Sequence, residues 1–132
     1  FDDDTPHQVA VHELQKRNHK LRIEESFTSG IISNNILSAK DSHKVFSGSN
    51  IIPRKECGGS NFKLTKNEIL LKASHLDPDQ NIQKLGTVTF TVRDVKQSTI
   101  SRANYRDNSP RMKERAASYA LISLISFIKA YY

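Results

Sequence analysis

The sequence predicts an α/β fold in which a mixed β-sheet is covered by helices on both faces, giving three layers in one domain over residues 1–132. Three observations support this class. Helix-start signals stand near both ends of the chain, an extended run turns into a helical pattern near residue 26, and apolar residues alternate after Gly86. The chain has 132 residues and 36% hydrophobic content, which is enough for one buried core.

The first helix is predicted from its starting residues. Thr5 is a favourable N-cap, Pro6 suits the first helical position, and Gln8 could close a capping box. We therefore expect a helix from Pro6 through about Arg17.

The other elements follow from helical or alternating spacing of apolar residues. Ser109 and Pro110 repeat the helix-start signal and open the final helix. We expect a strand over 20–26, a helix over 28–38, a short strand or helix turn within 67–74, a hairpin of strands over 87–93 and 98–105, and the final helix up to about residue 131.

Side chains from the hairpin and the last helix should share one core. Their spacing predicts that Val88, Phe90, Val92, Leu121 and Leu124 pack together. The apolar stripe of the last helix is wider than one sheet face covers. It continues through Ile122, Phe127 and Tyr131. Such a stripe favours contact with a second subunit, so we expect self-association, most simply as a two-fold dimer.

The segment Glu25–Gly30 joins the first strand to the second helix. A strand that turns into a helix presents a hydroxyl, backbone N–H groups and the positive end of the helix dipole together. That combination suits a nucleophile or a bound anion. The simpler alternative, a Ser/Thr N-cap with no further role, fits the same residues.

The chain carries a formal charge of +6, with the cations spread along its whole length. A solvated basic surface is the favoured interpretation. A basic pocket for a phosphorylated small molecule would fit the same charge, and nucleic-acid binding rests on net charge alone. Arg111, Lys113 and Arg115 crowd the start of the last helix, where a bound anion would offset their unfavourable interaction with the dipole. Three solvent-facing cations are the alternative. Tyr105 is the only aromatic residue among the cations between residues 93 and 115.

Composition also limits the other classes of site. Cys57 is the only cysteine, and no apolar run reaches the ~20 residues of a membrane span, so we expect a cytoplasmic protein without membrane contact. His75 and Asp77 are too few ligands for a metal site. We expect neither a metal nor a cofactor.

Three blocks together resemble the C-terminal domain of the CinA family, which is named for competence- or damage-inducible proteins. They are Glu25–Gly30, Gly86-Thr87-Val88 before a strand, and the Arg-rich helix start followed by Ala116-Ala117. Active members of this family are nicotinamide mononucleotide deamidases. The resemblance also implies a turn over 45–48 leading into a strand over 50–53.

The resemblance assigns roles to individual residues. Ser26 would attack the carboxamide carbon, and the N–H groups of Thr28, Ser29 and Gly30 would hold the oxyanion. Arg111, Lys113 and Arg115 would bind the phosphate of a small-molecule nucleotide.

This sequence departs from the family at the residues that activate the serine. The family's tyrosine position is Pro53 and its lysine position is Gly58, so Lys55 is the nearest candidate base. We therefore expect deamidase activity to be weak or absent. The alternative is a catalytically degenerate module that binds a nucleotide or serves in assembly.

Overall fold

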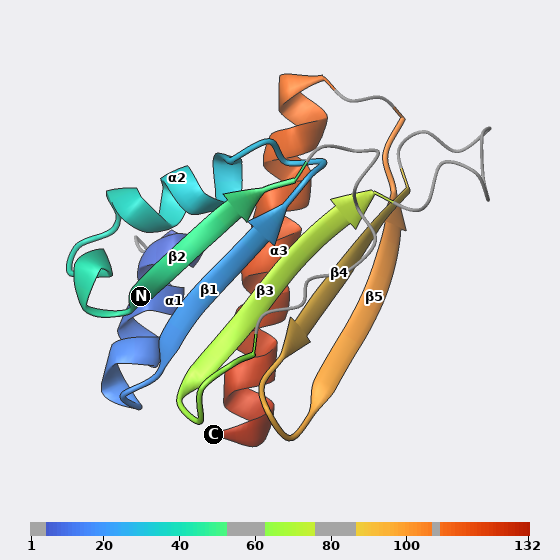
Figure 1. Cartoon of the computed structure of the whole chain (residues 1–132). Coiled ribbons are helices and arrows are strands. Elements are labelled where there is room, and N and C mark those ends of the chain that lie inside the picture. Colours follow the sequence, from blue (N-terminus) through green and yellow to red (C-terminus); the bar gives the residue numbers. More distant parts are fainter. Residues whose placement is uncertain (1–4, 53–62, 76–86, 107–108) are drawn as a thin grey trace.

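Five strands form one mixed sheet in the order β2-β1-β3-β4-β5 (Figure 1). The computed structural model describes residues 5–52, 63–75, 87–106 and 109–132. The strands are β1 (Lys20–Glu25), β2 (Phe46–Ile51), β3 (Glu68–His75), β4 (Thr87–Arg93) and β5 (Ser98–Asn104). The helices are α1 (Pro6–Lys16), α2 (Ile31–Ser38), the short 3-10 helix η1 (Ser42–Lys44) and α3 (Pro110–Tyr131). β1 runs parallel to β2 and β3, whereas β3, β4 and β5 are antiparallel neighbours.

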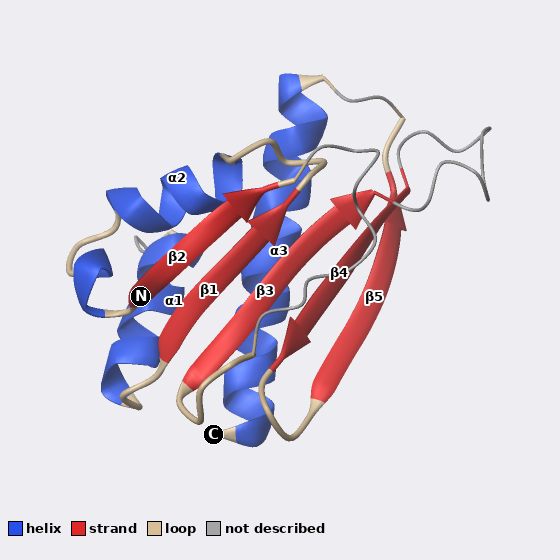
Figure 2. Cartoon of the chain, in the orientation of Figure 1, coloured by secondary structure: helices blue, strands red, loops and turns tan. Residues whose placement is uncertain are grey.

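The three α-helices lie on the same face of the sheet and contact one another (Figure 2). The predicted α/β class with a mixed sheet is confirmed. The expected second layer of helices is not found among the described residues. The other face of β1 and β3 carries Arg22, Glu24 and Lys72. These charged groups interrupt the face, so it lacks the continuous apolar surface on which a layer of helices packs.

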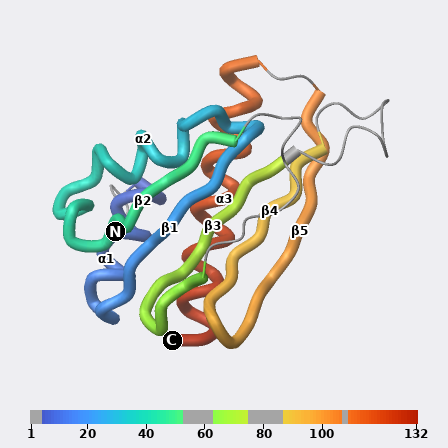
Figure 3. The backbone as a smooth tube through the Cα atoms, viewed as in Figure 1, coloured from blue at the N-terminus to red at the C-terminus, as the bar shows by residue number. Residues whose placement is uncertain are grey.

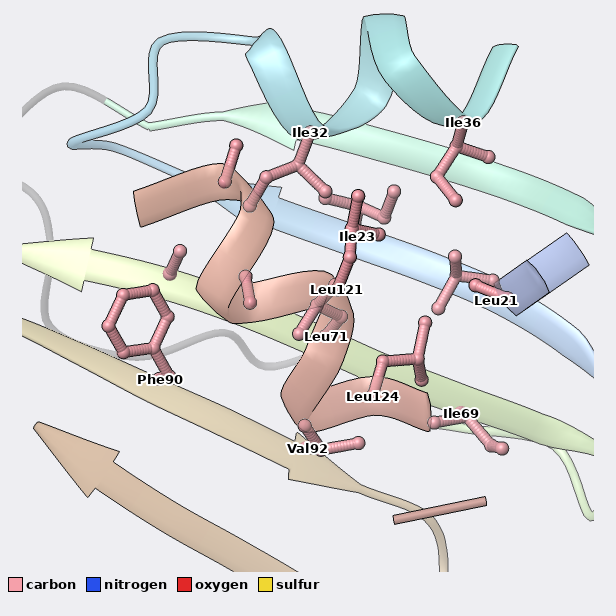
Figure 4. Close-up of a cluster of buried hydrophobic side chains, with 14 of the residues drawn as sticks. Leu21, Ile23, Ile32, Ile36, Ile69, Leu71, Phe90, Val92, Leu121 and Leu124 are labelled. Carbon is pink, nitrogen blue, oxygen red and sulfur yellow. The ribbon is translucent and has the colours of Figure 1, made fainter. Parts of the chain in front are cut away.

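The core lies between the helices and the apolar face of the sheet (Figure 4). The predicted core residues Val88, Phe90, Val92, Leu121 and Leu124 are all buried in one cluster. This part of the prediction is confirmed.

α1 begins as its sequence predicts but without the predicted capping box. The hydroxyl of Thr5 accepts a hydrogen bond from the Gln8 amide at 3.2 Å. The Gln8 side chain does not turn back to the cap. Its Oε1 accepts from the Lys40 amide at 3.0 Å, which ties α1 to the segment after α2.

Two other boundaries differ from the sequence prediction. α2 begins at Ile31 instead of Thr28, because Ser29 and Gly30 have left-handed φ angles of 53° and 94°. β2 already begins at Phe46, where the family resemblance implied a turn. The ambiguous segment 67–74 forms β3, and the predicted hairpin is confirmed as β4 and β5.

The buried carboxylate of Glu25 holds the start of α2. It accepts hydrogen bonds from the backbone amides of Ile32 at 3.1 Å and Ser33 at 2.8 Å. It also accepts from the hydroxyls of Thr28 and Ser33, each at 2.5 Å. The unpaired amides of the helix start and the buried charge therefore satisfy each other.

A second polar contact anchors the end of α3. The Tyr132 hydroxyl donates to Asp94, which also accepts from the backbone amides of Lys96 and Gln97 in the β4–β5 turn. Burial raises the pKa of Asp94, but these donors outweigh burial and hold that pKa below its ordinary value. Burial and the Asp94 carboxylate raise the pKa of Tyr132 to about 12.

Within the described residues, α3 and the shorter helices fall short of the length and apolar character that a membrane span requires.

Replacing Glu25 with glutamine should lower the free energy of unfolding by about 2–3 kcal/mol, because the amide NH2 cannot accept from the Ser33 donors. Urea denaturation monitored by circular dichroism measures this loss. Glu114→Gln is the matched control, since it removes the same charge from an exposed position of α3. Equal losses in the two variants would show that Glu25 does not hold the helix start.

Tyr132→Phe should lower the free energy of unfolding by about 1 kcal/mol at neutral pH, because Asp94 loses a donor that is 43% exposed. Tyr131→Phe is the control, since the Tyr131 hydroxyl makes no hydrogen bond to a described residue. The difference between wild type and Tyr132→Phe should fade as pH drops through the lowered pKa of Asp94. It should also fade as pH rises from 10 towards the Tyr132 value of about 12. A difference that stays constant from acid to alkaline pH would contradict the assignment.

Candidate functional site

The turn over residues 26–30 lies at the carboxyl ends of the parallel strands (Figure 3). The Ser26 amide donates to the Ala73 carbonyl at 2.9 Å, and the Ile52 amide donates to the Glu25 carbonyl at 2.7 Å. The turn is thus held between the ends of β2 and β3. Ligands of open α/β sheets bind at such an edge, where neighbouring strands are connected in opposite directions. Ser26 is buried at the strand-to-helix turn, the place predicted for it.

Thr28 supports this turn from inside. Its side chain is fully buried, and its hydroxyl is engaged by Glu25. The Thr28 side chain therefore stabilises the turn. The amides of Thr28, Ser29 and Gly30 make no hydrogen bond to any described residue. Ser29 is exposed and Gly30 is partly exposed, so their N–H groups can reach a bound anion, whereas the fully buried Thr28 does not offer its amide to a ligand as predicted.

The dipole of α2 is already partly neutralised. Glu25 occupies the first turn of the helix through the amides of Ile32 and Ser33. A second anion placed there would be repelled by the Glu25 carboxylate. An anionic ligand would consequently depend on the turn amides and on a cation from elsewhere in the chain.

Lys113 of α3 supplies such a cation. Its Nζ lies 3.0 Å from the hydroxyl of Ser29. Residues 84 positions apart in the sequence are thereby brought together. The candidate site therefore combines the amides of Ser29 and Gly30, the Ser29 hydroxyl and the Lys113 ammonium group, with Ser26 three residues before Ser29 in the same turn.

The structure separates the other two predicted cations from Lys113. Arg111 and Arg115 are one helical turn apart on a different side of α3, where they line an open hollow of about 720 Å³. Tyr105 and Tyr119 line the same hollow. The three predicted cations therefore lie at two separate positions, with Lys113 at the turn and Arg111 and Arg115 at the hollow.

Aromatic contact connects this hollow to the Ser26 turn. The ring of Phe27 stacks on Tyr105, with centroids 5.4 Å apart and planes at 27°. Burial and the neighbouring Tyr119 raise the pKa of Tyr105, although Arg115 acts in the opposite direction. The sequence interpretation did not place Phe27 or Tyr105 in the site. The available signal was the position of Tyr105 as the only aromatic residue among the cations of that region.

Several predicted positions fall outside the described residues. They include the candidate base Lys55, the two departures Pro53 and Gly58, and Asp77 of the weak metal pair. Among the described residues, no three histidine, cysteine, aspartate or glutamate side chains are grouped closely enough to hold a metal ion.

No protein-family model and no curated protein matches the sequence. Solved structures do match the fold. A competence or damage-inducible protein from Enterobacter asburiae is 12% identical, with a TM-score of 0.75 over 96% of this chain and 99% of that chain. A competence-damaged protein (CinA) superfamily protein from Enterobacter cloacae is 13% identical, with a TM-score of 0.76 over 94% of this chain and 92% of that chain.

A third structure, competence/damage inducible protein CihA from Agrobacterium tumefaciens, is 12% identical, with a TM-score of 0.69 over 92% of this chain and 94% of that chain. These likenesses extend over nearly the whole of each chain, and their identities are low enough that they establish the fold alone. The fold of this chain is the one seen in CinA-superfamily structures, as its short motifs predicted.

Proposed function

We propose that this chain is a divergent CinA-type domain that binds a nicotinamide nucleotide at the turn over residues 26–30 and hydrolyses its amide weakly or not at all. One observation carries the proposal. The turn lies at the carboxyl edge of the sheet with the Ser29 and Gly30 amides bonded to no described residue, and Lys113 is 3.0 Å from the Ser29 hydroxyl. Backbone amides beside a lysine form a favourable environment for a phosphate or an oxyanion.

The proposed roles follow from this placement. Ser26 would attack the carboxamide carbon, and the neighbouring turn amides would hold the oxyanion. Lys113 would bind the phosphate of the nucleotide. Arg111 and Arg115 would attract the anionic ligand from a distance, because they face the adjacent hollow.

Weak hydrolysis is proposed because a serine hydroxyl needs a base within hydrogen-bond reach. The family's lysine and tyrosine positions are Gly58 and Pro53 here, and neither residue can take a proton. Loss of a general base typically lowers the rate by about 10²–10⁴. A domain that keeps the anion-binding groups but loses the base would bind the nucleotide without turning it over efficiently.

Binding should depend on Lys113. Lys113→Met is expected to weaken the affinity for nicotinamide mononucleotide at least ~10-fold, equivalent to about 1.4 kcal/mol, because it removes a charged phosphate contact. Isothermal titration calorimetry measures this change. Lys129→Met, at the other end of α3, makes the same charge change and should leave the affinity unaltered. Equal effects in both variants would point to general electrostatics and would reject the site.

Hydrolysis should be slow. Ammonia release from nicotinamide mononucleotide is expected well below ~1 s⁻¹, the lower range of typical enzymes. Ser26→Ala should leave the binding affinity within about twofold, because the proposed phosphate contacts lie at Ser29 and Lys113. Release at ~1 s⁻¹ or faster that disappears in Ser26→Ala would contradict the proposed inactivity. Lys55→Ala would then test whether that residue is the base.

A further inference from the structure

β5 leaves one flank of α3 uncovered. It is the last strand of the sheet, and three of its residues lie opposite the core residues of β4 and therefore face α3. These residues are small: Thr99, Ser101 and Ala103. They do not fill the space beside the helix, so a groove of about 440 Å³ remains along Tyr119, Ile122 and Phe127.

The flank of α3 beside this groove is apolar and exposed. Ile122 is 54% exposed and Tyr131 is 46% exposed, although the sequence pattern had placed both in the buried stripe. Ile100 of β5 is 60% exposed on the other face of the same edge. Large apolar side chains gathered along one strand and one helix indicate a surface that another chain covers.

The edge of β5 is open to pairing. On the side away from β4, no described strand lies beside it. Natural edge strands commonly carry several charges, a proline or a bulge that prevents pairing with other chains. β5 has no proline, and Arg102 is its only charged residue.

We propose that a second copy of this chain pairs with β5 in antiparallel orientation about a two-fold axis, so that two sheets join into one and the flanks of both α3 helices line the same groove. A register centred on Ser101 pairs all seven residues of β5. It places Ile100 opposite the partner's Arg102, whose aliphatic stem can cover the isoleucine. No two arginines stand directly opposite each other in this register, so the strand complements itself.

The size of the surface sets the expected strength. A strand of seven residues is about 24 Å long, and one flank of a 22-residue helix is about 30 Å long and about 10 Å wide. Together they offer roughly 450 Å² per copy, or about 900 Å² in total, which is below the standard size of stable interfaces and predicts a weak, transient dimer. Each copy carries a formal charge of +6, so added salt should strengthen the dimer by screening the repulsion. Binding of an acidic partner would weaken with salt instead.

Sedimentation equilibrium of the full chain from about 10 to about 300 µM tests the proposal. Wild type should shift from monomer to dimer, and the shift should occur at lower concentration in higher salt. Ile122→Lys should remain monomeric because it places a charge in the groove. Leu37→Lys is the matched control, since Leu37 on α2 is also 54% exposed and lies outside the proposed surface.

A cross-link tests the register. In a Cys57→Ser background, Ser101→Cys should form a disulfide-linked dimer on oxidation, because directly opposed antiparallel Cα atoms lie about 4.5–5.5 Å apart. Ser38→Cys on α2 should not. A monomer across the whole concentration range, or a dimer that Ile122→Lys leaves intact, would overturn the proposal. A dimer that is lost in Ile122→Lys but shows no link at position 101 would overturn the strand pairing.

Discussion

The arrangement of this domain depends on the buried carboxylate of Glu25. It lies where β1 ends, and it accepts hydrogen bonds from two amides of α2 and from the hydroxyls of Thr28 and Ser33. A buried charge is tolerated only when such donors surround it, and a helix start needs acceptors for its free amides. The amides at the start of α2 supply donors to the carboxylate, and the carboxylate supplies the acceptors that these amides need. The path of the chain between strand and helix, and hence the position of Ser26, follows from this exchange.

The same contact limits what the site can do. Because Glu25 takes the positive end of α2, the helix start is not an independent anion site. What remains for a ligand is the row of turn amides and the Lys113 ammonium group beside Ser29. The position of Lys113 depends in turn on α3, which packs against α1, α2 and the sheet. The geometry of the candidate site is therefore a product of the whole core and not of the short motif alone.

The two faces of the sheet differ in a way that explains the layering and the uncovered flank. One face is apolar and carries all three α-helices, while the other carries the ion pair of Arg22 with Glu68 and the charged neighbours Glu24 and Lys72. At the β5 edge, the residues that face α3 become too small to cover it. α3 is thus buried against β3, β4 and the other helices but exposed along the flank beside β5.

Local patterns in the sequence determined the caps of α1 and α3, the alternating strand β4 with its hairpin partner, and the place of Ser26 between a strand and a helix. Each of these depends on residues a few positions apart, where periodicity and capping chemistry act. Only the tertiary structure decided that all the described helices share one face, that Gln8 bonds to Lys40, and that Lys113 turns to Ser29 while Arg111 and Arg115 turn away. These outcomes join residues from 32 to 84 positions apart. The side-chain directions that produce them are set by how the elements pack, and this packing cannot be predicted from the spacing of neighbouring residues.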